Sequence, residues 1–470
     1  MTAKIKHSFR AKRSPEDFLN GALETGKWLR SQEHRSDIGS WWEKHPSRAD
    51  EGQIDLMHGN AGIILFFISL ADASGDKSFL DDAKRGADYA VNMIKKYGTD
   101  FLESGMAGNH YRSGTKYTLI SGGAAGVAYA LTELNRELEK PEESYTETAL
   151  KLTEEIIDNA AEIPEGITWS RKSGFNFDSG TILYLLYAAE HYGHPEWVDT
   201  ALKAGRAILS TGTAEETGGT KFVGFTNMVK AMIGSDDPNA DVPNFCYGSA
   251  GIGYTFARLY QASGDESFLE GAREAARYLE GIAAVDGDAA LTPYRLPDLP
   301  DVYYLSSCHG IIGTIRLFKL LSDITGESEY REWIDKYTEG FKATGAPELH
   351  SSGYWNCHSY CCGNAGYADG FAGLYLATGD KKFLDLVGRN AAVILADAHE
   401  EPEGISWYQA FKRIDPSDVS REIGYYSGAA GIGAALVNAY LAYKGEAPAY
   451  RLLEEPYPAR GEENKAAAGI

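Results

Sequence analysis

The chain has 470 residues, 43% of them hydrophobic, and can therefore bury a large core. Its 67 acidic and 45 basic residues give a formal net charge of -22. This charge repels the phosphate backbone that nucleic-acid-binding proteins must neutralise, and it argues against nucleic acid as a partner.

The N-terminus and the apolar runs carry no signal for export or membrane insertion. Residues 1–14 are basic but lack the apolar core of a secretory signal, and the longest apolar run, 61–70, is too short to span a bilayer. We therefore expect a cytoplasmic protein without a membrane span. The five cysteines, an odd number, fit metal binding or catalysis better than a disulfide framework in that compartment.

A glycine motif recurs along the whole chain. It has the form Gly-x-x-Gly and is followed each time by an apolar helical run. Its anchor glycines lie about 53 to 68 residues apart, which leaves room for two helices and their loops. In the third copy, Leu183 stands where the second glycine is expected. The seven copies open at His58, Ser121, Asp178, Tyr247, His309, Cys362 and Ser427.

The residues after each motif predict a helical hairpin. The first run, as in 251–260, is rich in glycine and alanine and apolar nearly all round, which indicates an inner helix packed on both sides. A turn such as Gly264-Asp265 ends it, because glycine favours a left-handed C-cap and aspartate an N-cap. The following run, as in 268–279, is amphipathic and predicts an outer helix with one solvated face.

These patterns predict an all-α fold in which seven hairpins form an α/α toroid with inner and outer helix rings. Closure is favoured over an open solenoid, because an open array needs polar terminal repeats and the terminal copies here are as apolar as the others. We divide the chain into an N-terminal helical lead-in (1–50), the toroid with its metal site (51–445) and a C-terminal tail (446–470).

Four of the five cysteines lie at or beside the motif in copies four to six: Cys246, Cys308, Cys361 and Cys362. In a closed ring, equivalent motif positions converge on one end of the central cavity. A free cysteine is often only a small buried apolar residue, but an adjacent pair opposite a third cysteine indicates a metal site. Zinc takes tetrahedral sulfur and nitrogen ligands, and three protein ligands leave a fourth position open for catalysis.

From about Gly52 to about Tyr443 the sequence resembles the lanthionine synthetase C-like family. The resemblance rests on the repeated motif, on Ser307-Cys308-His309-Gly310 in copy five and on Cys361-Cys362-Gly363 in copy six. Ser307 departs from the family's usual tryptophan. The resemblance implies a ring of seven inner and seven outer helices and a zinc ion held by Cys308, Cys361 and Cys362, a three-cysteine variant of the family's site.

A second register of the same motifs stays open. Cys246-Tyr247-Gly248 followed by Cys308-His309-Gly310 also matches the family pair, and it would make Cys246, Cys308 and His309 the ligands. We prefer the first set, because it places the pair in copies five and six with a single repeat following.

The resemblance also implies an activity: a metal-activated thiol of a peptide cysteine adds to a dehydrated serine or threonine and forms a thioether ring. The added carbon must then be protonated. The family uses a histidine just before the fourth-copy glycine, where this chain has Tyr247, and an aspartate near the third copy. Tyr247, His309 beside a proposed ligand, and Asp178 are therefore the candidate catalytic residues.

Other functions stay open. A related enzyme would add glutathione or another thiol to dehydrated residues, a glycan-processing toroid would use paired carboxylates, and a non-catalytic ring would only bind peptides. The expected partner is a peptide with cysteine and dehydrated residues. The dehydration itself is expected to come from a separate dehydratase.

Overall fold

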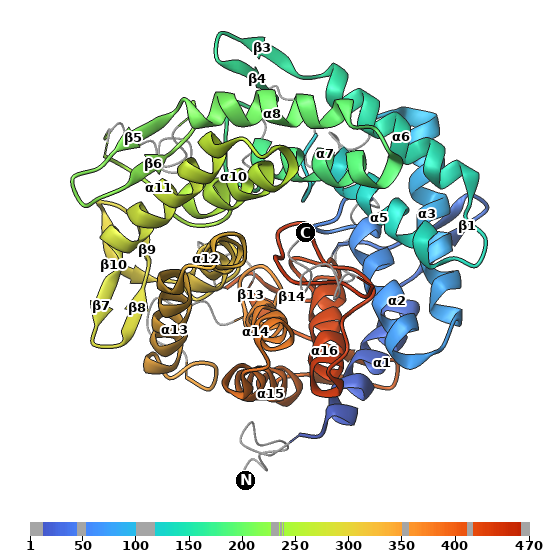
Figure 1. The fold of residues 1–470 in the computed structure, drawn as a ribbon. Coiled ribbons are helices and arrows are strands. Elements are labelled where there is room, and N and C mark those ends of the chain that lie inside the picture. The colour runs from blue at the N-terminus through green and yellow to red at the C-terminus, as the bar shows by residue number, and fades with distance from the viewer. Residues whose placement is uncertain are drawn as a thin grey trace.

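The computed structural model describes residues 13–44, 53–99, 118–226, 235, 237, 239–349, 357–410 and 417–461. The parts of the expected lead-in and tail at 1–12 and 462–470 lie outside these residues. Figure 1 shows two concentric rings of helices. The inner ring consists of α2 (Asn60–Ser74), α5 (Ala124–Glu137), α7 (Asp178–Tyr192), α10 (Ser249–Ser263), α12 (Ile311–Thr325), α14 (Asn364–Thr378) and α16 (Ala429–Lys444).

The inner ring is closed. Each inner helix contacts the next one along the chain, and α16 contacts α2, so the cycle has no free end among the described residues (Figure 1). Most residues of these helices are buried, as the apolar, small-residue composition predicts. The predicted α/α toroid and its closure are therefore confirmed.

The outer ring packs against the inner one helix by helix. Six outer helices follow their inner partners in the chain: α3 (Ser78–Tyr97), α6 (Glu143–Asp158), α8 (Glu196–Leu209), α11 (Glu266–Ile282), α13 (Ser328–Ala343) and α15 (Lys381–Ala396). The seventh is α1 (Pro15–Ser31), which packs on α16. The expected N-terminal lead-in thus contains the outer helix of the last hairpin, and the two ends of the chain together close the ring.

The predicted turn between inner and outer helices is present. Gly264 ends α10 and Gly379 ends α14, both with left-handed φ angles near 70° that glycine adopts without strain. The carboxylates of Asp265 and Asp380 then accept hydrogen bonds from the backbone N–H groups of Ser267 and Lys382 at the start of α11 and α15. Local sequence therefore determines the tight reversal of each of these hairpins.

Short antiparallel hairpins, which the sequence analysis did not predict, connect many outer helices to the next motif. Strands this short carry too few residues to show an alternating pattern. Paired in order along the chain, they are β1 (His34–Ser36) with β2 (Gly39–Trp41), β3 (Ala161–Ile163) with β4 (Gly166–Thr168), β5 (Gly212–Ala214) with β6 (Thr220–Phe222), β7 (Ala284–Asp286) with β8 (Ala289–Leu291), β9 (Pro293–Arg295) with β10 (Leu299–Tyr303), β11 (His399–Glu401) with β12 (Gly404–Ser406), and β13 (Gln409–Ala410) with β14 (Val419–Ser420).

The second motif glycine is the third residue of every inner helix, and its role is steric. A β-carbon on Gly251 would overlap the carbonyl oxygen of Phe245, and one on Gly431 would overlap that of Tyr425. The same clash with a preceding loop carbonyl recurs in every copy. Glycine therefore lets the loop before each inner helix pack directly against the helix start.

This geometry corrects the predicted register of the third copy. Helix α7 begins at Asp178, so Gly180 is its third residue and corresponds to the second glycine of the other copies. A β-carbon there would meet the carbonyl oxygen of Phe175. Phe177 takes the place of the first glycine, and Leu183 has no special role in the motif. The register of this copy could not be read correctly from the sequence, because only one of its two glycines is present.

The segment after α16, residues 446–461, lies inside the ring (Figure 1). It has no helix or strand, yet much of it is buried, including Tyr450, Glu454, Glu455 and Tyr457. Inner-helix tyrosines hold its backbone, since the Tyr129 hydroxyl donates to the carbonyl of Arg451 and the Tyr254 hydroxyl to that of Leu453. The segment that we had placed in a C-terminal tail therefore fills the centre of the toroid.

Candidate metal centre

The residues at one position of the repeated motif, one from each copy, surround the ring axis. The residue three places before each inner helix lines one shared cavity in all seven copies. We call these seven the belt residues: Met57, Ser121, Phe175, Cys246, Cys308, Cys361 and Tyr426. The close packing allowed by the motif glycines sets their depth, so the belt follows directly from the repeat.

Backbone hydrogen bonds join neighbouring belt residues. The N–H of Cys246 donates to the carbonyl of Cys308 at 3.1 Å, the N–H of Cys308 to Cys361 at 3.3 Å, and the N–H of Cys361 to Tyr426 at 2.9 Å. Met57 donates in the same way to Ser121 at 2.8 Å. These bonds satisfy loop groups that would otherwise be buried without partners, and they fix the spacing of the side chains around the cavity.

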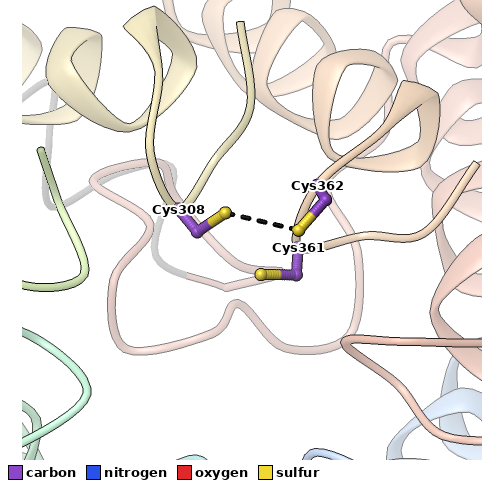
Figure 2. Close-up of side chains that lie close together, drawn as sticks. All are labelled: Cys308, Cys361 and Cys362. Atoms are coloured by element: carbon purple, nitrogen blue, oxygen red, sulfur yellow. Dashed lines mark hydrogen bonds between the residues drawn. The ribbon is translucent and has the colours of Figure 1, made fainter. Parts of the chain in front are cut away.

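Three thiols meet on one side of this belt. The sulfur atoms of Cys308, Cys361 and Cys362 all lie within 4.8 Å of one another, and Cys308 Sγ is 3.5 Å from Cys362 Sγ (Figure 2). Cys308 comes from the loop before α12, and the adjacent pair comes from the loop before α14. The structure thus brings together the three cysteines of the preferred register from two neighbouring copies.

The three thiols of the cluster differ in pKa. Burial alone would raise the pKa of the Cys308 thiol, but hydrogen bonds from Cys246, Cys361 and Cys362 hold that pKa well below its ordinary value. The hydrogen bonds that Cys361 and Cys362 give to Cys308, together with burial, raise their own pKa values. Cys308 is therefore the thiol that ionises first.

The donor set fits a soft divalent metal. Three thiols at this mutual distance can surround one ion, and the half-buried Cys361 leaves one side of the cluster accessible. Cys246 shows why the second register is less favourable, because its sulfur does not belong to the compact group even though its thiol interacts with Cys308. The structure supports a potential metal site made of three cysteines.

Two of the predicted catalytic residues lie beside the cluster in an aromatic group. The half-buried ring of His309 is 5.1 Å from that of Tyr247 and 5.4 Å from that of Tyr294, measured between ring centroids. The His309 Nδ1 atom is buried and has no hydrogen-bond partner among the described residues. His309 and Tyr247 therefore lie next to Cys308, but neither of them lines the axial cavity.

Asp178, the third predicted catalytic residue, is buried at the start of α7 and is fully hydrogen-bonded. One carboxylate oxygen accepts from Thr168 Oγ1 at 2.5 Å and from the N–H of Trp169 at 3.2 Å. The other accepts from the N–H and the hydroxyl of Ser170 at 3.0 and 2.6 Å. These four bonds tie the loop at 168–170 to the helix, and Asp178 does not line the axial cavity.

The cavity also contains charged groups that the sequence analysis missed. Arg316, on α12, and Glu454, from the C-terminal segment, also line it. Both are buried, and Glu454 Oε1 accepts a hydrogen bond from the hydroxyl of the belt residue Tyr426 at 2.7 Å. The belt could have been found by aligning the copies on their helix starts. Glu454 lies outside every repeat, and no motif indicates it.

A closed ring of helical hairpins with a three-cysteine cluster, two members of which line its axial cavity, defines an α/α toroid protein with a potential metal site. The model of the family described as "Lanthionine synthetase C-like protein" matches residues 50–225 and 120–346, which together exceed half of the chain. The chain belongs to this family, and the resemblance inferred from its motifs is confirmed.

One solved structure supports the fold, and two others are more distantly similar. Nisin cyclase is similar, with a TM-score of 0.60 and 15% sequence identity over 92% of this chain and 98% of that one. A sugar epimerase from a ruminal bacterium has a TM-score of 0.48 and 13% identity, covering 92% and 98% of the two chains. An α-1,6-mannanase from Salegentibacter sp. has a TM-score of 0.47 and 13% identity, covering 91% and 99%. No curated protein matches the sequence.

The predicted absence of a membrane span can be compared with the helices of the structure. Among the described residues, none of the helices has the length and apolar character needed to cross a bilayer. This agrees with the absence of a long apolar run in the sequence.

Proposed function

We propose that this protein catalyses the zinc-dependent addition of a peptide cysteine thiol to dehydroalanine or dehydrobutyrine, forming a lanthionine-type thioether ring. The observation that carries the proposal is the convergence of the Cys308, Cys361 and Cys362 thiols in a lanthionine synthetase C-like toroid, where Cys308 and Cys361 line the axial cavity. The metal, when bound, would lower the pKa of the substrate thiol. The open side of the cluster would receive that thiol.

The protein's own residues would supply orientation and proton transfer. His309 is the best placed of the predicted proton donors to the α-carbon of the dehydrated residue, because it lies beside Cys308 and its buried Nδ1 has no partner among the described residues. Tyr247 packs against its ring and would hold it in place. Asp178, whose oxygens are occupied, would act by fixing the loop that leads to the belt residue Phe175.

The test is metal content by elemental analysis of the wild type and of Cys308→Ala, Cys361→Ala and Cys362→Ala. We expect about one zinc per chain in the wild type and its loss in all three variants. Cys357→Ala is the matched control, because Cys357 is equally buried but bonds to Ser359 rather than to the cluster. Zinc that survives the three substitutions and disappears in Cys246→Ala would establish the second register instead.

Activity is tested with a short peptide that carries one cysteine and one dehydroalanine. Ring formation removes the free thiol without changing the mass, so it is followed by the loss of alkylation with iodoacetamide. A wild type that binds zinc but leaves this peptide alkylatable, and that adds glutathione to the dehydroalanine, would favour the related thiol-adding activity. A zinc-free protein that cleaves glycans would contradict both.

A further inference from the structure

The C-terminal segment delivers one carboxylate to the cavity of the cysteine cluster. Glu454 has only 1% of its surface exposed, and it lines the same cavity as Cys308 and Cys361. Its Oε1 atom accepts the hydroxyl of Tyr426, whose backbone carbonyl accepts the N–H of Cys361. The belt thus connects Glu454 and the cluster through a single residue.

The second oxygen of this carboxylate has no structural use. Glu454 Oε2 is buried and lacks a hydrogen-bond partner among the described residues. Buried carboxylate oxygens are nearly always paired, so an unpaired one that lines a cavity indicates an interaction with something that enters the cavity. The adjacent Glu455 also has an Oε2 atom without a partner among the described residues, and its Oε1 pairs with Arg316 and accepts the Tyr360 hydroxyl at 2.9 Å. What distinguishes Glu454 is that it lines the cavity, whereas Glu455 does not.

We infer that Glu454 is the proton acceptor for the substrate thiol. This inference rests on the proposed function. The S–H bond breaks, the proton moves to Glu454 Oε2 and the electron pair stays on sulfur. The sulfur then bonds to the β-carbon of the dehydrated residue, the π electrons move to the α-carbon, and the proton donor protonates that carbon. Glu454 afterwards returns its proton to solvent, and the donor takes one up, so that no net proton is gained or lost.

The charges around Glu454 suit a group that accepts a proton near neutral pH. Burial raises the pKa of the Glu454 carboxyl to about 7, Arg316 opposes this shift, and the neighbouring Glu455 adds to it. The Tyr426 hydroxyl, through its hydrogen bond, favours the ionised form. A base with a pKa near the working pH both exists as carboxylate and holds the proton that it accepts.

The direct test measures protons when a thiol binds, and it needs no turnover. Zinc-loaded wild type, Glu454→Gln and the control Glu133→Gln are titrated with a cysteine-containing peptide at pH 8, in two buffers of different ionisation enthalpy. Glu133 is a buried carboxylate on α5 that pairs with Arg136 and does not line the cavity. The difference in binding enthalpy between the two buffers gives the number of protons released. We expect the wild type and Glu133→Gln to release a fraction of a proton fewer than Glu454→Gln, because the negative charge of the bound thiolate raises the pKa of the Glu454 carboxyl further and this carboxyl then keeps part of the thiol proton. Equal release in all three proteins overturns the inference.

The second test is the rate of thiol addition to a dehydroalanine peptide. Glu454→Gln should be slower by roughly 10²- to 10⁴-fold at pH 7, the usual range for loss of an acid–base group. Raising the pH toward the thiol pKa should restore part of the rate, as should an aromatic thiol that is already ionised. Glu454→Asp, which keeps the carboxylate, should keep more of the activity.

The outcomes separate the two proposals. An active wild type and a Glu454→Gln variant with the same rate and pH profile overturn the role of Glu454 alone. A wild type that binds the thiol but adds it to no dehydrated peptide overturns the proposed function, and proton release still decides whether Glu454 accepts the proton. Zinc content and thermal melting of each variant show whether it folds. A folded, zinc-loaded Glu454→Gln that loses only stability indicates a purely structural residue.

Discussion

At the scale of single residues, the axial cavity combines groups that stability alone would not select. Glu454 is buried with one unpaired oxygen, and three thiols are packed against one another without a disulfide. Buried polar groups without partners cost free energy, and proteins retain them chiefly at functional sites. We therefore expect these groups to lower the stability of the fold and to be retained for their chemistry.

The burial of the Glu454 carboxylate predicts a pH-dependent gain in stability for Glu454→Gln. Burial raises the pKa of Glu454 from 4.5 to about 7 in the folded protein, so the folded state holds this proton more tightly than the unfolded state does. The stability contributed by the group is present below pH 4.5 and is lost as the pH rises toward 7. Relative to the wild type, the variant should gain roughly 2.5 kcal/mol between pH 5 and pH 8.

Urea unfolding of both proteins at the two pH values measures this difference. The comparison cancels the other titrating groups, since they are common to wild type and variant. A difference that stays constant with pH would mean that Glu454 titrates alike in the folded and unfolded states, and that its burial is compensated elsewhere.

The site residues differ in how far the sequence could reveal them. Cys308, Cys361 and Cys362 were predictable, because they lie at fixed offsets from a repeated motif and their residue type has few other uses there. Glu454 was not, because its position depends on the path of a segment without repeat or periodicity. For Asp178 the residue type suggested acid–base chemistry, but only the structure shows its four hydrogen bonds.

At the scale of elements, the helix start links the repeat to the site. The second motif glycine removes the side chain that would push the preceding loop away, and that loop carries the belt residue. The sequence therefore predicted the hairpins and their glycine and aspartate caps well, since those depend on local residues. It missed the short β-hairpins, and it misassigned the third copy, where a phenylalanine replaces one glycine.

Substitutions at the two ends of α16 test this role of glycine. Gly431→Ala should destabilise the protein by about 3 kcal/mol, because its β-carbon would overlap the Tyr425 carbonyl oxygen and backbone must shift. Gly445→Ala is the matched control: it has a left-handed φ of 72° but no atom within 4 Å of the new β-carbon, so only about 1 kcal/mol of backbone strain is expected. Urea unfolding measures both, and equal losses would show that backbone conformation rather than space requires Gly431.

At the scale of the whole molecule, the two ends of the chain complete the toroid. Helix α1 supplies the outer partner of α16, and residues 446–461 lie inside the ring (Figure 1). Repeat counting predicted seven hairpins and a closed ring. It did not predict that the last hairpin is assembled from opposite ends of the sequence, because pairing between distant segments leaves no local pattern.

A buried ion pair fixes the C-terminal segment in the ring. Arg316 on α12 pairs with Glu455, and both side chains are almost completely buried. Removing one partner leaves an uncompensated charge, so Arg316→Met should cost about 3 to 5 kcal/mol of stability. The double variant Arg316→Met/Glu455→Met removes both charges and should recover most of that loss, since an apolar pair of similar volume is often nearly neutral.

Urea unfolding gives the two stabilities, and trypsin locates the effect. Arg451 is a cleavage site whose side chain is buried in the ring centre, where it pairs with Asp369 at 3.2 Å. If the Arg316 pair anchors the segment, cleavage after Arg451 should be much faster in Arg316→Met than in the wild type, at temperatures where both remain folded, and slow again in the double variant. Faster cleavage in both variants would show that the charges themselves position the segment, and unchanged cleavage in Arg316→Met would show that the tyrosine contacts are sufficient to hold it.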